Sequence, residues 1–262
     1  MTILDFKKMK TENKKISMVT CYDHWSAQII AQTNIDCILV GDSLAMVVHG
    51  HPSTLQATTE MMTLHTAAVS RGAVKKFIVA DMPFLTFRKG VGAAMECVEK
   101  LMQAGAHAVK LEGVDGHEDV VRQIVDSGVP VMGHLGLTPQ SIHKFGGFKV
   151  QGKDDSAAQD IIRQASKLEE LGCFSVVLEC IPTQVATHIT KTLSIPTIGI
   201  GAGINVDGQV LVLQDLLGMN NTFKPKFLKQ YLKGNELLSN ALNNFDTEVK
   251  NLKFPTELES YA

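Results

Sequence analysis

Eight short apolar runs recur along this 262-residue chain, and their pattern limits the folds that it can adopt. Each run is rich in Val and Ile, and in most of them apolar residues follow one another instead of alternating with polar ones. That pattern is typical of parallel strands buried on both faces of a sheet. We therefore predict strands within residues 16–23, 35–43, 75–83, 107–113, 129–136, 174–180, 195–203 and 209–218.

Helix-like segments lie between most of these runs, because apolar residues there recur at spacings of three and four. They cover residues 23–34, 58–72, 92–105, 116–128, 155–172 and 182–194. Eight strand–helix units in one uninterrupted chain predict an α/β fold, the (β/α)8 TIM barrel, with an open doubly wound sheet as the alternative. No linker separates a second domain, so we predict a single barrel domain over residues 1–262, with a capping helix in residues 4–14 and terminal helices in residues 223–262.

Charge and hydropathy exclude several classes of function. Charged residues make up 20% of the chain and the formal net charge is -2, so no global field attracts nucleic acid or an anionic membrane. The sequence has no run of about 18 apolar residues and no apolar signal segment at its start, so we expect neither a membrane span nor secretion. We expect a cytoplasmic protein that acts on small molecules, with its five scattered cysteines reduced.

Polar or glycine residues end the predicted strands. In a (β/α)8 barrel the active site lies at the carboxyl ends of the strands, so these residues are expected to form one ring. A single acid after a strand is as readily explained as a helix N-cap. Six acids in one ring need a common reason, because burying isolated carboxylates is costly unless a cation compensates them. The ring comprises Asp23, Asp42, Asp81, Glu112, His134, Glu179, Gly201 and Asp215.

Three of these acids, Asp42, Asp81 and Glu112, suit a divalent metal ion. Lys110 and Glu112 are two residues apart and so share one face of a strand. Oxygen ligands without clustered His or Cys favour a hard cation, Mg2+ before Mn2+ or Ca2+. The alternative is an ion-pair network around Lys110 that holds no metal. Convergence of these groups requires that two sets of residues point into the barrel, Ile38, Val40 and Asp42 on one strand and Phe77, Val79 and Asp81 on the next.

Glu179 is a candidate general base. It ends an apolar run that Pro182 closes, so its carboxylate is expected to be partly desolvated. A base facing a metal fits proton removal alpha to a metal-bound carbonyl, where the metal stabilises the enolate. The alternative is a purely structural role, in which Glu179 pairs with a lysine or with His134. His134 either hydrogen-bonds substrate or a metal-bound water, or serves as a structural donor.

Several strings of the sequence resemble those of the ketopantoate hydroxymethyltransferase family. They run in order from about Met18 to Tyr231 and read VGDSLAMVVHGHPSTLQATTEMM, VADMPF, AGAHAVKLEG, VPVMGHLGLTPQS, GGFKVQGK, LECIP, IPTIGIGAG and PKFLKQY. The resemblance implies a cytoplasmic barrel enzyme that assembles as a homo-oligomer, typically a decamer. It also implies transfer of a hydroxymethyl group from 5,10-methylenetetrahydrofolate to 3-methyl-2-oxobutanoate, with Mg2+ bound. The product is 2-dehydropantoate (ketopantoate), in the first step of pantothenate biosynthesis.

The same resemblance implies roles for particular residues. The metal is expected to be served by Asp42, Asp81 and Glu112, and Glu179 to accept the proton. Substrate contacts are expected from Asp42, Ser43, Asp81 and Lys110, to which the strand-end argument adds His134.

One departure from the family pattern and two rival functions remain. Phe87 lies in FLTFRKG, where related chains usually have a tyrosine, so a hydroxyl on the expected folate side is missing. The nearest rival is a Mg2+-dependent carbon–carbon lyase or mutase of the phosphoenolpyruvate mutase/isocitrate lyase kind. The rival from another class is a non-catalytic barrel that binds a small molecule.

Overall fold

The computed structural model describes residues 1–220 and 224–261. Contacts divide the chain into two compact units, Met1–Leu211 and Val212–Ala262, and each is described by itself. The first residue of the predicted terminal segment, Phe223, and the last, Ala262, lie outside the described residues.

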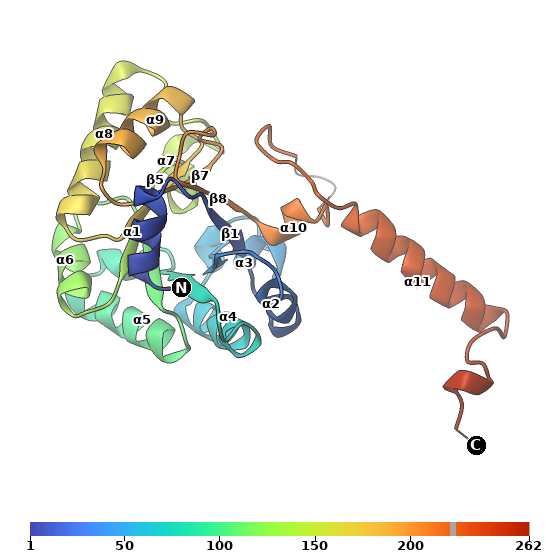
Figure 1. The fold of residues 1–262 in the computed structure, drawn as a ribbon. Helices are drawn as coiled ribbons and strands as arrows, with labels where there is room; N and C mark the ends of the chain where they lie inside the picture. Colours follow the sequence, from blue (N-terminus) through green and yellow to red (C-terminus); the bar gives the residue numbers. More distant parts are fainter. Residues whose placement is uncertain (221–223, 262) are drawn as a thin grey trace. The chain divides into compact units, whose positions relative to one another are not determined.

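Eight parallel strands of the first unit close into a barrel, as the sequence predicts (Figure 1). Each strand pairs with the next along the chain, and β8 pairs with β1. All residues of β2, β3 and β4 are buried, which explains why their apolar residues run together. The strands are β1 (Ile16–Thr20), β2 (Cys37–Val40), β3 (Phe77–Asp81), β4 (Ala108–Glu112), β5 (Val131–Gly136), β6 (Ser175–Glu179), β7 (Thr197–Ile200) and β8 (Gly208–Leu211).

Helices connect the successive strands from β1 to β7 and surround the barrel (Figure 1), whereas in the described chain β7 and β8 are joined without a helix. Side-chain caps fix several helix starts: Thr58 accepts from the Met61 N–H before α4, and Asp154 accepts from the Ala157 N–H before α8. The helices are α2 (His24–Ala31), α3 (Leu44–Val47), α4 (Thr59–Gly72), α5 (Val91–Gln103), α6 (Glu118–Asp126), α7 (Ile142–Phe145), α8 (Asp155–Glu170) and α9 (Thr183–Thr192), with short 3-10 turns η1 (Thr54–Gln56), η2 (Thr86–Arg88) and η3 (Pro139–Ser141).

The predicted capping helix is α1 (Ile3–Thr11), which packs against the amino ends of the strands. Its Phe6 is fully buried and meets Phe77 and Phe174 edge to face, at ring-centroid distances of 5.4 and 5.2 Å. These three phenylalanine rings fill the end of the barrel opposite the carboxyl ends of the strands, because Phe77 begins β3 and Phe174 directly precedes β6. The barrel interior is therefore a packed core, and only its other end is left for a site.

The interior of β2 corrects one sequence-based expectation. Cys37 and Leu39, and not Ile38 and Val40, belong to the core cluster that includes Phe77 and Val79. The side chains of β2 that point into the barrel are therefore those of Cys37 and Leu39, and the next position in this alternation is Gly41. Asp42 reaches the site all the same, because the strand ends at Val40 and the chain turns into α3, so strict alternation stops before Asp42.

The register of the barrel sets the polar strand ends side by side. Asp81 pairs with Lys110 across β3 and β4, and Glu112 pairs with His134 across β4 and β5. Glu179 pairs with Gly136 across β5 and β6. Parallel strands in this register place all five polar side chains at one rim of the barrel.

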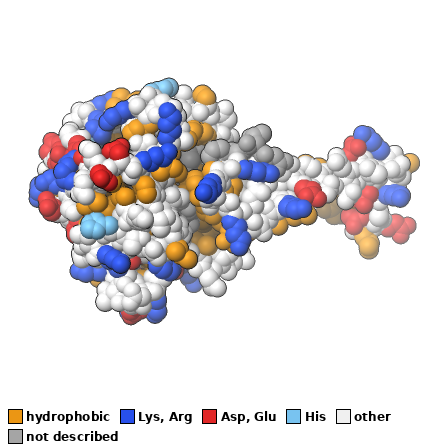
Figure 2. Space-filling model, turned by 90° about the horizontal axis from the view of Figure 1, so that it is seen from above, with side chains coloured by type: hydrophobic (Ala, Val, Ile, Leu, Met, Phe, Trp, Pro, Cys, Tyr) orange, Lys and Arg blue, Asp and Glu red, His pale blue; other side chains and the backbone are white. Residues whose placement is uncertain are grey.

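The second unit contains α10 (Leu213–Leu216), α11 (Gly234–Lys250) and the 3-10 turn η4 (Glu257–Glu259). The sequence-based prediction that Asp215 ends a strand is wrong, because β8 stops at Leu211 and Asp215 lies within α10. None of the helices in the described part of the chain is long and apolar enough to span a membrane. On the face drawn in Figure 2, basic and acidic side chains are interspersed and form no field of one sign.

Candidate active site

Six predicted site residues meet at the carboxyl ends of β2 to β6. Five of them are almost fully buried, each with at most 4% of its surface exposed: Asp42, Asp81, Lys110, Glu112 and His134. Glu179 closes the group from β6, and 17% of its side chain is exposed. The convergence that the strand ends predict is confirmed, and one carboxylate of the group has access to solvent.

Asp42, Asp81 and Lys110 form the first half of the site. The Asp42 N–H donates to Asp81 Oδ2 at 3.0 Å, and Lys110 Nζ lies 2.9 Å from Asp81 Oδ1. A Cβ at Gly41 would lie 2.8 Å from Ser43 Oγ, so a larger residue at this position would displace the Ser43 hydroxyl. Ser43 itself is held by the buried Tyr22, whose hydroxyl lies 2.7 Å from Ser43 Oγ.

His134 joins this half to the general-base candidate. Its Nε2 lies 3.2 Å from Glu179 Oε2, its Nδ1 lies 3.5 Å from Glu112 Oε1, and Lys110 Nζ lies 3.4 Å from Nδ1. Burial and the neighbouring Lys110 lower the pKa of His134, but the carboxylates of Glu112 and Glu179 outweigh them and raise it to about 9. The two carboxylates therefore favour the cationic form of His134, which lies between them.

Gln140 is a site residue that the sequence analysis did not single out. It lies in η3, just after β5, and is buried. Its side-chain amide donates to Asp42 Oδ2 at 2.8 Å and to the Met82 carbonyl at 3.0 Å, and its backbone N–H donates to Glu112 Oε2 at 3.0 Å. Gln140 thereby fixes carboxylates from two different strands. A glutamine after a proline in a loop has no spacing that marks it as functional.

The electrostatics of the site indicate a surplus of negative charge. Burial, Asp81 and Glu112 raise the pKa of Asp42 well above its usual value, and Lys110 only partly offsets them. Burial would lower the pKa of Lys110, but Asp81, Glu112 and Asp42 raise it, so the lysine stays charged. A further cation placed among these oxygens would relieve the surplus.

The donor set matches what Mg2+ takes from a protein, namely one or two carboxylates, with water or substrate oxygens completing the shell. Asp42 and Asp81 are adjacent. Both oxygens of Asp81 face other groups, the Asp42 N–H and Lys110, and both oxygens of Glu112 face Gln140 and His134. Among residues 1–220 and 224–261, no three or more His, Cys, Asp or Glu side chains form a group that could hold a metal ion. The metal role of Asp42, Asp81 and Glu112 thus stays a prediction.

Three members of the predicted ring take no part in this group. Asp23 is the N-cap of α2, and its carboxylate accepts from the Ser26 N–H at 2.9 Å and from the Ser26 hydroxyl at 2.8 Å. Asp215 lies in α10 and belongs to the second unit. Gly201 follows β7 and offers no side chain.

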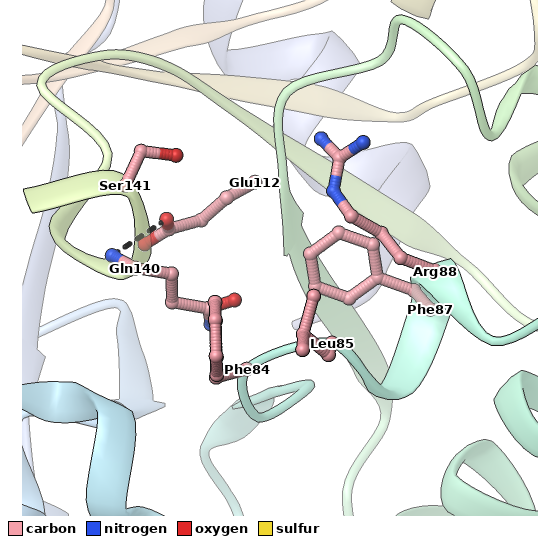
Figure 3. Close-up of a pocket in the computed structure, with 7 residues that line it drawn as sticks. All are labelled: Phe84, Leu85, Phe87, Arg88, Glu112, Gln140 and Ser141. Carbon is pink, nitrogen blue, oxygen red and sulfur yellow. Dashed lines mark hydrogen bonds between the residues drawn. The ribbon is translucent and has the colours of Figure 1, made fainter. Parts of the chain in front are cut away.

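A small cavity adjoins the site beside Glu112 and Gln140 (Figure 3). Its space of about 40 Å³ has room for a few water molecules. Phe87 is 2% exposed and packs against His117 at a ring-centroid distance of 5.0 Å, so its ring belongs to the buried wall of the cavity. Phe84 and Leu85 are more than one third exposed. The lining residues are Phe84, Leu85, Phe87, Arg88, Glu112, Gln140 and Ser141.

Comparison with known proteins identifies relatives over nearly the whole chain. The sequence model of the ketopantoate hydroxymethyltransferase family matches residues 1–257. A 3-methyl-2-oxobutanoate hydroxymethyltransferase of Coxiella burnetii (strain CbuK_Q154) is 61% identical over 259 residues, which are 98% of this chain and 97% of that protein. A protein of the same name from Bdellovibrio bacteriovorus is 59% identical over 261 residues, which are 100% of this chain and 99% of that protein.

A solved structure confirms the fold at low sequence identity. A 2,3-dimethylmalate lyase, described as a member of the PEP mutase/isocitrate lyase superfamily, superposes with a TM-score of 0.58. The match covers 99% of this chain and 91% of that chain at 13% identity. At this identity the likeness concerns the barrel and carries nothing about the reaction.

Proposed function

The chain belongs to the ketopantoate hydroxymethyltransferase family, and we propose that the buried group at the ends of β2 to β6 carries out its reaction. The chain is an enzyme that transfers a hydroxymethyl group to 3-methyl-2-oxobutanoate and forms ketopantoate. The proposed donor of the one-carbon unit is 5,10-methylenetetrahydrofolate. The observation that carries the assignment of the site is the position of Glu179, a partly exposed carboxylate facing a buried group of acids and a lysine.

Glu179 is the proposed base that removes the proton from C3 of the keto acid. It is the most exposed of the six convergent side chains, so a substrate entering from solvent meets it first. His134 Nε2 holds one of its oxygens at 3.2 Å, which orients the carboxylate and leaves the other oxygen for the proton. The cationic Lys110 and His134 offset negative charge that develops on the substrate.

Asp42 and Asp81 are the proposed direct ligands of Mg2+, and Glu112 serves the ion through water. Asp42 Oδ2 accepts from Gln140, which leaves Oδ1 of the same carboxylate for the ion. Mg2+ bound here would act as a Lewis acid and make the C3 proton of the keto acid more acidic. Ser43 at the turn after Gly41 is a proposed contact of the substrate carboxylate, and Tyr22 fixes its hydroxyl.

The proposed reaction is tested by omission of the folate. We expect ketopantoate to form from 3-methyl-2-oxobutanoate only when 5,10-methylenetetrahydrofolate and Mg2+ are both present, and EDTA to abolish its formation until Mg2+ is restored. The reason is that the keto acid contains no carbon that could become the hydroxymethyl group. A carbon–carbon lyase of the same fold turns over without folate, so consumption of the keto acid at an unchanged rate in its absence would exclude our assignment.

We further propose that the chain is cytoplasmic and works as a homo-oligomer, a decamer by the family resemblance. Support comes from α11, on which apolar residues at spacings of four and three are all at least 42% exposed: Leu238, Leu242, Phe245 and Val249. A stripe of this kind on a helix is typical of a surface that packs against another chain. Light scattering coupled to size-exclusion chromatography should give a mass several times that of the chain, and a monomeric mass would contradict the proposal.

A further inference from the structure

Two histidines outside the carboxylate site face each other through their Nε2 atoms. His49 follows α3 in an exposed loop, and His65 is a half-buried residue of α4. The two Nε2 atoms lie 2.9 Å apart, and the ring planes are nearly perpendicular at 89°. Neither residue has a role in the proposed reaction, so the arrangement needs its own explanation.

The hydrogen bonds of His65 determine which of its nitrogens has a free lone pair. His65 Nδ1 lies 2.5 Å from the Tyr22 carbonyl oxygen. A carbonyl oxygen only accepts, so Nδ1 of His65 carries the hydrogen, and Nε2 of the neutral ring carries a lone pair directed at His49. A backbone carbonyl that fixes the distal nitrogen in this way is the usual support of a metal-binding histidine.

We propose that His49 and His65 bind a transition-metal ion such as Zn2+ between their Nε2 atoms. Two imidazole nitrogens on a tetrahedral Zn2+ at bonds of about 2.0–2.1 Å are separated by about 3.3 Å. The observed separation of 2.9 Å is therefore within a few tenths of an ångström of that required. His65 is fixed by α4 and Tyr22, whereas the exposed His49 is free to rotate by this amount.

A third imidazole, that of His51, lies beside His49. Its ring stacks over that of His49 at a centroid distance of 6.4 Å and an angle of 22°, and its side chain is exposed. In the described ranges, 1–220 and 224–261, His, Cys, Asp and Glu form no ready-made group of three or more that could hold a metal. The site is thus a two-histidine site that water, or His51 after a side-chain rotation, completes.

The chemistry of the pair separates it from the carboxylate site. Imidazole nitrogens favour Zn2+, Cu2+ and Ni2+, whereas carboxylate oxygens favour Mg2+. An excess of Mg2+ should therefore leave the histidine site available while it occupies the oxygen ligands. The inference does not depend on the proposed function, since its readout is metal binding.

Equilibrium dialysis of the full chain against Zn2+, with excess Mg2+ present, tests the proposal. We expect one tightly bound equivalent of Zn2+ in the unaltered chain and a loss of at least about tenfold in its affinity in His49→Ala and in His65→Ala. His188→Ala removes an exposed histidine of α9 and serves as the matched control, which should bind Zn2+ as the unaltered chain does.

The exposed position of His49 keeps the test decisive if His65→Ala disturbs α4. Circular dichroism of His49→Ala should match that of the unaltered chain. Zn2+ bound with unchanged affinity by a folded His49→Ala chain would place the ion elsewhere and overturn the proposal. Failure of the unaltered chain to retain Zn2+ would overturn it equally, leaving only a hydrogen bond between the two histidines.

Discussion

Replacement of Glu179 by glutamine is expected to lower kcat for ketopantoate formation by about 10²- to 10⁴-fold, the range that a positioned general base contributes. Glutamine has nearly the shape of glutamate but cannot take up the C3 proton. The change leaves the buried residues Asp42, Asp81 and Lys110 in place, so binding of 3-methyl-2-oxobutanoate should persist. Steady-state assays for kcat, and titration calorimetry for substrate binding, measure the two effects separately.

The matched control for this variant is Glu170→Gln. Glu170 is the last residue of α8, and its side chain is 66% exposed. It should therefore show unaltered kinetics. A Glu179→Gln enzyme with kcat close to that of the unaltered chain would show that Glu179 is only an ion-pair partner of His134 and not the base.

The second large effect concerns the metal. Asp81→Asn is expected to raise the Mg2+ concentration needed for half-maximal activity by at least about tenfold, because a neutral amide is a far weaker ligand for a hard cation than a carboxylate. The same change removes the ion-pair partner of Lys110. We therefore also expect a lower Tm, because a buried charge without its partner is costly.

Two further measurements distinguish a loss of Mg2+ binding from a general loss of folded structure in Asp81→Asn. Asp160→Asn changes an exposed aspartate of α8 that pairs with Arg163, and it should leave the Mg2+ dependence as it is. Calorimetric titration of folded Asp81→Asn with Mg2+ should show weakened binding in the absence of substrate. An Asp81→Asn enzyme with an unchanged Mg2+ requirement would support an ion-pair network without a metal around Lys110.

The fold could be predicted because buried parallel strands leave a clear mark on the sequence. Runs such as that from Phe77 to Ala80 are apolar at successive positions because both faces of the strand are covered. The site followed from one rule, that polar side chains at strand ends share a rim, and it brought Lys110, His134 and Glu179 together with the two aspartates. Substrate and one-carbon donor came only from the family resemblance.

Other features depend on where each strand stops, which local patterns define poorly. The inward phase of β2 was wrong because alternation was carried past Val40 into the turn at Gly41. Asp215 was placed in the ring because the apolar run continues beyond Leu211 into α10. Asp23 shows the opposite case, in which an acid after a strand serves only to cap α2.

Gln140 marks the limit of prediction from a single sequence. Its hydrogen bonds to Asp42, Met82 and Glu112 join residues far apart in the chain, and no pattern in the sequence around Gln140 predicts them. The contact between His49 and His65 is similar, because it joins a loop residue to a residue of α4 that lies 16 positions along the chain. Such pairs are set by tertiary structure and not by spacing along the chain.

Deuterium exchange at C3 of 3-methyl-2-oxobutanoate, followed by ¹H NMR in D2O without folate, tests the central claim most directly. The account predicts that the unaltered chain with Mg2+ removes the C3–H signal, because Glu179 takes the proton before any one-carbon unit arrives. It predicts exchange at least about 10²-fold slower with Glu179→Gln. Exchange at equal rates in the two proteins would contradict the claim that Glu179 is the base.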